Sequence, residues 1–215
     1  MEPNNKIKIA IDGPAGAGKS TVARMVAGRL GYIYVDTGAM YRAITWYVLE
    51  AGLDIADRKQ IADALQAIAL ELKPSDNGQQ VWLNGREVTA MIRSPEVTGQ
   101  VSAVAQIPEV RNFLTKIQQT LSSGGGIVMD GRDIGTKGLP EAELKIFLTA
   151  TVEERATRRY REMEAAGVHI SLEQLKEEIA KRDRMDEERE VSPLRQAEDA
   201  IYLDCTAMSI EQVVD

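Results

Sequence analysis

The segment from Gly13 to Ser20 carries the clearest chemical signal in the chain, because it matches the pattern G-x-x-x-x-G-K-[ST] in full. Such a loop turns its backbone N–H groups inward around phosphate oxygens, and the helix after it adds partial positive charge. We expect Lys19 to reach the outer phosphates of a nucleoside triphosphate, and the Ser20 hydroxyl to help hold Mg²⁺. The alternative is a glycine-rich turn with an exposed lysine. The predicted phosphate loop consists of Gly13, Pro14, Ala15, Gly16, Ala17, Gly18, Lys19, Ser20 and Thr21.

A second candidate phosphate contact lies in the segment Asp36-Thr-Gly-Ala-Met-Tyr-Arg42, after a short predicted strand. Arg42 would lie one turn into a helix with Tyr41 beside it, where it could hold a second phosphate near the first. A guanidinium suits this task because its fork of donors matches phosphate oxygens. The spacing leaves an alternative open, in which Asp36 or Thr37 caps the helix and Arg42 faces water.

A third candidate segment, residues 130–136, reads Asp-Gly-Arg-Asp-Ile-Gly-Thr and follows an apolar predicted strand. Ligands of open α/β sheets bind beyond the carboxyl ends of parallel strands, so Arg132 and Asp133 are well placed to contact one. The alternative is that Asp130 or Asp133 caps a helix or turn.

Two predicted helices carry arginines three and four residues apart, a spacing that puts them on one helix face. They could approach a ligand, or they could face water and pair with acidic residues of the same helix. The residues are Arg155, Arg158 and Arg159 on the first helix, and Arg182, Asp186 and Arg189 on the second.

The elements that must position these residues follow an alternating α/β pattern. Continuous apolar runs are typical of a parallel sheet covered on both faces. An Asn-Gly turn at 84–85 predicts a β-hairpin over 81–88, inserted on one side of the main sheet. Strands are predicted at 6–11, 32–35, 127–130, 144–148 and 201–203. Helices are predicted at 19–30, 38–51, 57–69, 94–122 with a break at Pro108, 152–166, 171–190 and 209–215.

Composition narrows the possible functions. The chain has 215 residues and a net charge of −7, which argues against nonspecific binding to nucleic acid or to anionic membranes. A single cysteine excludes an intramolecular disulfide, and with a single histidine it excludes a Cys/His metal site. No apolar run approaches a membrane span and no signal peptide is evident, so we expect a cytoplasmic protein.

Taken together, the segments at 13–21, 36–42, 131–136 and 182–189 closely resemble the bacterial cytidylate kinase family, from residue 6 to about residue 213. The resemblance implies transfer of a phosphoryl group from ATP to CMP or dCMP, with Mg²⁺. It also implies a three-layer P-loop α/β fold with a central parallel sheet. One kinase domain would comprise a core (about 6–56, 105–150 and 195–215), a monophosphate-binding insertion (about 57–104) and a lid (about 151–194). A monomer is expected.

The resemblance further implies which residues handle phosphate. Arg42, Arg132 and Arg189 would hold the phosphate of the acceptor. Arg158 and Arg182 would approach the phosphoryl group during transfer.

The resemblance likewise implies which residues recognise the base of the acceptor and which lie near its phosphate and sugar. Ser102, Arg111 and Asp133 would read the cytosine. Thr37 and Asp186 would lie near the phosphate and the sugar.

Two other kinds of function remain as alternatives. One is a related kinase of another small acceptor, such as UMP. The other is a nucleotide-binding switch or scaffold without a small acceptor. A guanine-specific switch would carry an Asn-Lys-x-Asp segment, which the sequence lacks.

Overall fold

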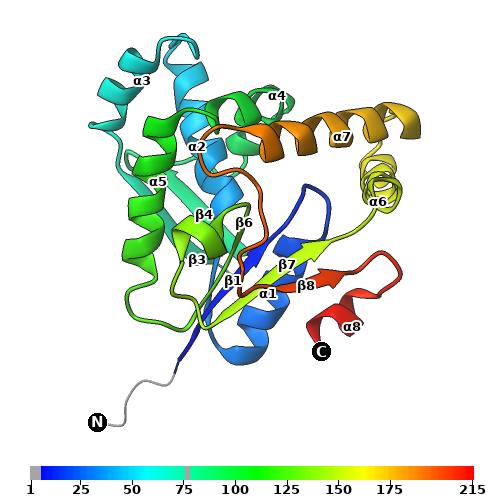
Figure 1. Ribbon diagram of the computed structural model, residues 1–215. Helices are drawn as coiled ribbons and strands as arrows, with labels where there is room; N and C mark the ends of the chain where they lie inside the picture. Colours follow the sequence, from blue (N-terminus) through cyan, green and yellow to red (C-terminus); the bar gives the residue numbers. More distant parts are fainter. Residues whose placement is uncertain (1–5, 76–77) are drawn as a thin grey trace, which may run out of the picture.

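The computed structural model describes residues 6–75 and 78–215, and its centre is a five-stranded parallel sheet (Figure 1). The strands lie in the order β2, β6, β1, β7, β8. Their bounds are β1 (Lys8–Asp12), β2 (Ile33–Asp36), β6 (Ile127–Gly131), β7 (Leu144–Thr149) and β8 (Ile201–Asp204). The predicted parallel sheet is confirmed.

Helices cover both faces of this sheet and make three layers. Successive residues of β1 point to opposite faces, so Ile9 and Ile11 pack with Val22 of α1, whereas Ala10 packs with Ile44 of α2. The helices are α1 (Lys19–Leu30), α2 (Thr37–Glu50), α3 (Arg58–Leu65), α4 (Pro95–Val104), α5 (Pro108–Leu121), α6 (Val152–Ala165), α7 (Leu172–Glu188) and α8 (Ile210–Val214). Two short segments, η1 (Met91–Arg93) and η2 (Ile134–Gly138), complete the set of described helices.

A small antiparallel sheet forms the predicted insertion. It consists of β3 (Leu70–Ser75), β4 (Gly78–Leu83) and β5 (Arg86–Glu87). Asn84 and Gly85 both have positive φ, at 49° and 77°, as the tight hairpin turn requires. The hairpin prediction is confirmed, whereas β3 was not predicted from the sequence.

The prediction of a helix over 57–69 is wrong at its C-terminal end. The helix α3 begins after its N-cap Asp57 and ends at Leu65. Leu70 and Leu72 then alternate with exposed residues and pair with Leu83 and Val81 of β4. Pairing with β4 therefore overrides the helical preference of the alanine-rich residues that precede β3.

The break predicted at Pro108 is confirmed, because α4 and α5 are separate helices and proline begins α5. The helices α6 and α7 pack together through Ala156, Leu175 and Ile179. Figure 1 shows this pair on the opposite side of the molecule from α3. A capping box at Ser171 and Gln174 begins α7, as the sequence predicts. Among the described residues, no helix combines the length and apolarity needed to cross a membrane.

Candidate active site

The phosphate loop connects β1 to α1 and is held tightly against the sheet. Gly13 has φ of +148°, and a Cβ at this position would collide with the carbonyl oxygen of Leu148 on β7. Gly18, the residue before α1, has φ of +89°. Glycine is therefore required at the two ends of the loop, and the N-terminus of α1 points toward the space that the loop encloses.

Lys19 is buried, and its Nζ donates to the Pro14 carbonyl oxygen of its own loop at 2.7 Å. Burial lowers the pKa of Lys19 to about 7, and repulsion from Arg132 and Arg182 acts in the same direction. Asp130 and Asp12 attract the ammonium group but do not compensate for these effects. The lysine is thus held near the cavity arginines without a carboxylate contact of its own, which favours an anionic ligand.

Ser20 and Asp130 place two oxygen atoms that could coordinate a metal ion side by side at the phosphate loop. The Ser20 hydroxyl donates to Asp130 Oδ2 at 2.8 Å, and the Tyr34 hydroxyl donates to Asp130 Oδ1 at 2.9 Å. Burial and the nearby Asp36 raise the pKa of Asp130 to about 7. A hydroxyl and a buried carboxylate at this loop fit Mg²⁺, which prefers oxygen ligands and retains several waters. In the described part of the chain, no cluster of three His, Cys, Asp or Glu side chains forms a metal cage.

Asp12 ends β1 directly before the phosphate loop and was not among the predicted site residues. It accepts hydrogen bonds from the backbone N–H groups of Ile134 and Gly135, at 2.8 and 2.7 Å. Burial nevertheless raises its pKa to about 6. Asp12 therefore fixes the start of η2, and with it the segment that carries Arg132 and Asp133. Its place at the carboxyl end of a predicted strand was the available signal, and the same signal applies to Asp130.

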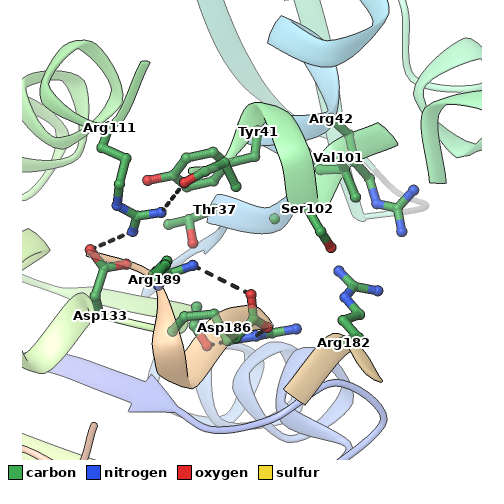
Figure 2. A pocket seen from close by; sticks show the side chains of 14 residues that line it. Thr37, Tyr41, Arg42, Val101, Ser102, Arg111, Asp133, Arg182, Asp186 and Arg189 are labelled. Carbon is green, nitrogen blue, oxygen red and sulfur yellow. Dashed lines mark hydrogen bonds and ion pairs between the residues drawn. The ribbon is translucent and has the colours of Figure 1, made fainter. Parts of the chain in front are cut away.

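A cavity that opens to solvent lies beside the phosphate loop, and ten residues predicted from the sequence line it (Figure 2). Helices of the core and the insertion supply Thr37, Tyr41, Arg42, Ser102 and Arg111.

The segment after β6, the helix α7 and the residue that follows α7 supply the other five. These are Arg132, Asp133, Arg182, Asp186 and Arg189. The structure thus brings together residues from four distant parts of the chain.

Arg111 and Asp133 form a buried ion pair at one end of the cavity. Arg111 Nη2 lies 2.7 Å from Asp133 Oδ2, and the two side chains are 2% and 6% exposed. The guanidinium also donates to the Ala105 carbonyl oxygen at 2.8 Å, and it stacks 5.0 Å from the centre of the Tyr41 ring. Partners on several sides hold the pair rigidly, so it presents a fixed donor and a fixed acceptor to the cavity.

Asp186 of α7 joins two further arginines. Its Oδ2 accepts from Arg132 Nε at 2.8 Å, and its Oδ1 accepts from Arg189 Nη1 at 3.4 Å. Burial alone would raise the pKa of Asp186, but Arg132, Arg182 and Arg189 together lower it. The aspartate is therefore a charged bridge between α7 and the segment after β6.

The sequence spacing predicts Arg189 on the face of a helix, but the structure differs. The helix α7 ends at Glu188, and Arg189 has extended backbone angles. Its Nε donates to the Ser192 carbonyl oxygen at 2.6 Å. The backbone bond from Leu194 N to Asp186 O closes this turn and directs Arg189 back toward the cavity.

At the other end of the cavity, Arg42 and Arg182 lie near each other, as Figure 2 shows. Arg42 donates to Thr98 Oγ1 at 2.8 Å and lines the cavity, so it does not simply face water, while Asp36 caps the helix as the alternative predicts. Contact of Arg42 with a phosphate stays a prediction. Burial lowers the pKa of Arg182 to about 10, and the charge of Arg132 adds to this effect. The Nε of Arg182 is buried and has no hydrogen-bond partner among the described residues.

The three arginines of α6 have different partners and different burial, although their spacing suggests a common face. Arg155 is buried and pairs with Asp183 of α7, with Nη2 at 2.6 Å from Oδ2. Its Nη1 also donates to the Ala15 carbonyl oxygen of the phosphate loop at 2.9 Å. Arg155, itself on α6, therefore connects the phosphate loop to α7.

Arg158 lies outside the cavity, beside the phosphate loop near Gly18. It donates to Glu154 Oε1 and to the Cys205 carbonyl oxygen, both at 2.9 Å. Arg159 is exposed and pairs with Glu162. The predicted approach of Arg158 to a transferring phosphoryl group stays a prediction.

Comparisons with known proteins agree with this arrangement. A family model for cytidylate kinase matches residues 9–215. The cytidylate kinase of Exiguobacterium sibiricum is 56% identical over 209 residues, which cover 97% of this chain and 94% of that protein. The cytidylate kinase of Geobacillus kaustophilus is also 56% identical, covering 98% of this chain and 94% of that protein.

A solved structure of an uncharacterized protein from Eubacterium ventriosum covers 97% of this chain, and the match covers 94% of that one. It superposes with a TM-score of 0.51 at 12% identity, which shows a shared fold alone. The family model and the two relatives span nearly the whole chain, including the phosphate loop and the arginine-lined cavity. On this evidence, the chain belongs to the cytidylate kinase family.

Proposed function

We propose that this protein transfers the γ-phosphoryl group of Mg·ATP to the phosphate of CMP and dCMP, giving CDP and dCDP. The observation that carries the proposal is the cavity beside the phosphate loop, where five arginines face two carboxylates. Two polyanions repel each other, so a kinase that joins them needs this excess of positive charge.

The acceptor would bind with its phosphate at the arginine-rich part of the cavity. Arg132 and Arg189 are held by Asp186 and keep further donors for phosphate oxygens, and Arg42 supplies a third guanidinium. Asp186 would also lie near the sugar, with Thr37 close by. The fixed guanidinium geometry favours bidentate contacts with phosphate.

The buried pair of Arg111 and Asp133 would read the base, with Ser102 nearby. Cytosine offers an amino donor and ring acceptors, which match a carboxylate and a guanidinium side by side. Uracil places an oxygen where cytosine has its amino group, and that oxygen would oppose the carboxylate of Asp133. UMP is therefore the less favoured acceptor, in agreement with the named relatives.

Transfer requires alignment of donor and acceptor and neutralisation of the charge that spreads over the moving phosphoryl group. Lys19 would contact the donor phosphates, and Arg132 and Arg182 would flank the transferred group from the acceptor side. Arg158 would act from the side of the phosphate loop. Holding the two nucleotides in line can supply about 7–11 kcal/mol of the barrier.

Ser20 and Asp130 would hold Mg²⁺, directly or through water. The ion supplies charge neutralisation at the donor phosphates when it is bound. Tyr34 keeps Asp130 oriented through its hydroxyl hydrogen bond.

The division into core, insertion (57–104) and lid (151–194) is part of the same proposal. Arg155 and Asp186 tie α6 and α7 to the core, so that the lid helices would exclude water during transfer. Exclusion of water would limit hydrolysis of ATP. We also propose a monomer that acts in the cytoplasm on nucleotides, without nucleic-acid or membrane partners.

The first prediction concerns the acceptor. ADP release from Mg·ATP is measured with CMP, dCMP, UMP, AMP, GMP and dTMP in turn. Turnover with CMP and dCMP is expected to exceed turnover with the purine acceptors by at least about a hundredfold, because buried polar groups left unpaired reject the wrong base. Efficient turnover with another acceptor would leave a kinase but remove the assigned roles of Ser102, Arg111 and Asp133. Release of ADP without any acceptor, or no release, would contradict the proposed function.

The second prediction separates transfer from binding. Arg182→Ala is expected to lower kcat by about 10²–10³, the usual loss for one charge-stabilising donor, because Arg182 neutralises the transferred group. The dissociation constant of CMP should change by less than about fivefold, since uniform binding is retained. Arg184→Ala on the exposed face of α7 is the matched control and should change neither value. A large loss of CMP affinity with unchanged kcat would contradict the role of Arg182.

The third prediction follows from the lowered pKa of Lys19, which is about 7. At about pH 8 the free lysine is largely neutral, and polyphosphate binding should restore its charge with uptake of a proton. Calorimetric titration with Mg·ATP in two buffers of different ionisation enthalpy measures this uptake. The uptake should be absent in Lys19→Met. Equal uptake in the variant, or none in the wild type, would contradict the role of Lys19.

A further inference from the structure

Among the described residues, the small sheet (β3, β4 and β5) does not line the cavity, but it contacts Asp36, the residue at which α2 begins. The helix α2 forms part of the cavity wall. None of the residues that line the cavity belongs to β3, β4 or β5 in the described part of the chain. Gln79 of β4 nevertheless reaches Asp36, the last residue of β2 and the N-cap of α2. This contact is the most direct polar link between the small sheet and the site.

Both the oxygen and the nitrogen of the Gln79 side-chain amide form hydrogen bonds with the backbone of one residue, Asp36. Its Oε1 accepts from the Asp36 backbone N–H at 3.0 Å, and its Nε2 donates to the Asp36 carbonyl oxygen at 3.5 Å. Gln79, Val81 and Leu83 lie on the same face of β4, and the latter two are buried in the core. This pair of hydrogen bonds, called the Gln79 clamp below, is therefore anchored by the packing of Val81 and Leu83, which follow Gln79 on the same face.

The position of Asp36 explains why such a clamp is useful. The strand β2 is at the edge of the main sheet and pairs with β6 on one side only. The backbone groups at its other edge have no strand to bond, and unpaired backbone groups lose order and stability. Gln79 supplies the missing partner at the point where β2 ends and α2 begins.

The position of Asp36 determines where α2 begins, and the first turns of α2 contribute side chains to the cavity. The Asp36 side chain accepts from Ala39 N–H at 2.9 Å and fixes the start of the helix. Thr37 Oγ1 donates to the Asp130 carbonyl oxygen at 2.7 Å, which ties the same turn to β6. From this turn, Thr37, Tyr41 and Arg42 enter the cavity.

We propose that Gln79 is a positioning residue for the acceptor site, and that the insertion sheet serves acceptor binding through it without touching the nucleotide. The inference rests on the proposed function, because it assigns the cavity to the acceptor monophosphate. Loss of these two hydrogen bonds would make the β2–α2 junction more mobile and would lower the affinity for the acceptor. Among the described residues, the phosphate loop makes no hydrogen bond to Gln79, Asp36 or Thr37, and its link to them runs only through Asp130, so ATP binding should change less than CMP binding.

The test compares two glutamines that are neighbours on the same strand. Gln79→Met keeps the length of the side chain but removes both hydrogen bonds to Asp36. Gln80→Met is the matched control, because Gln80 lies on the other face of β4 and accepts only from Trp82 Nε1, at 3.2 Å. Steady-state kinetics with CMP and with ATP varied separately, calorimetric CMP binding and thermal unfolding are measured for the wild type and both variants.

Gln79→Met is expected to raise KM and the dissociation constant for CMP by about five- to tenfold, the value of one or two net hydrogen bonds. Its KM for ATP should stay within about twofold of the wild type, since the substitution leaves the Asp36 carboxylate in place and, in the described part of the chain, Asp36 hydrogen-bonds no residue of the phosphate loop. Gln80→Met should leave both constants unchanged. Unchanged CMP constants in Gln79→Met, or an equal rise for ATP and CMP, would overturn the inference.

A second variant keeps the test informative if Gln79→Met unfolds at the assay temperature. Gln79→Glu retains an oxygen for the Asp36 N–H but sets a carboxylate oxygen against the Asp36 carbonyl oxygen, so a CMP-selective rise is again expected. An unchanged KM for CMP in this variant would then count against the inference. A wild type that turns over no CMP would refute the proposed function itself, which these variants do not address.

Discussion

Repulsion among buried arginines is the constraint on which the site depends. Five arginines line one cavity against only two carboxylates, and Lys19 lies close enough for Arg132 and Arg182 to lower its pKa. Burial of unpaired charge is costly, so the free protein tolerates this arrangement at the expense of stability. Binding of an anionic ligand removes this free-energy cost, because its negative charge neutralises the arginines. The same charge therefore explains both the affinity for phosphate groups and the capacity to stabilise their transfer.

The fold keeps these charges in place by two means. The carboxyl ends of β1, β2 and β6 meet at one edge of the sheet, where Asp12 and Asp36 fix the backbone of η2 and α2. The helices α6 and α7 complete the site, because Asp186 joins Arg132 to Arg189 and Arg155 joins the phosphate loop to α7. Asp186 thereby holds Arg132 and Arg189 at a defined spacing. The insertion sheet adds support from outside, at the exposed edge of β2.

Much of this arrangement could be predicted from the sequence, because local patterns encode the phosphate loop, the strand ends and the Asn-Gly hairpin. Other features depend on contacts between distant segments. The strand at 70–75 forms because β4 pairs with it, and Arg189 enters the site because a turn follows α7. Asp12 and Asp130 acquire raised pKa values mainly through burial, and Arg155 turns inward because Asp183 lies opposite. Periodicity does not contain such information.

The most direct test of the central claim is the change in melting temperature on addition of CMP compared with cytidine, at equal concentrations and low salt. The two ligands differ only in the phosphate. If repulsion among the cavity arginines is the governing constraint, CMP raises the melting temperature and cytidine raises it far less. The difference should shrink as salt screens the charges near the mouth of the cavity. Equal stabilisation by cytidine and CMP would show that base contacts govern binding, and would contradict the claim.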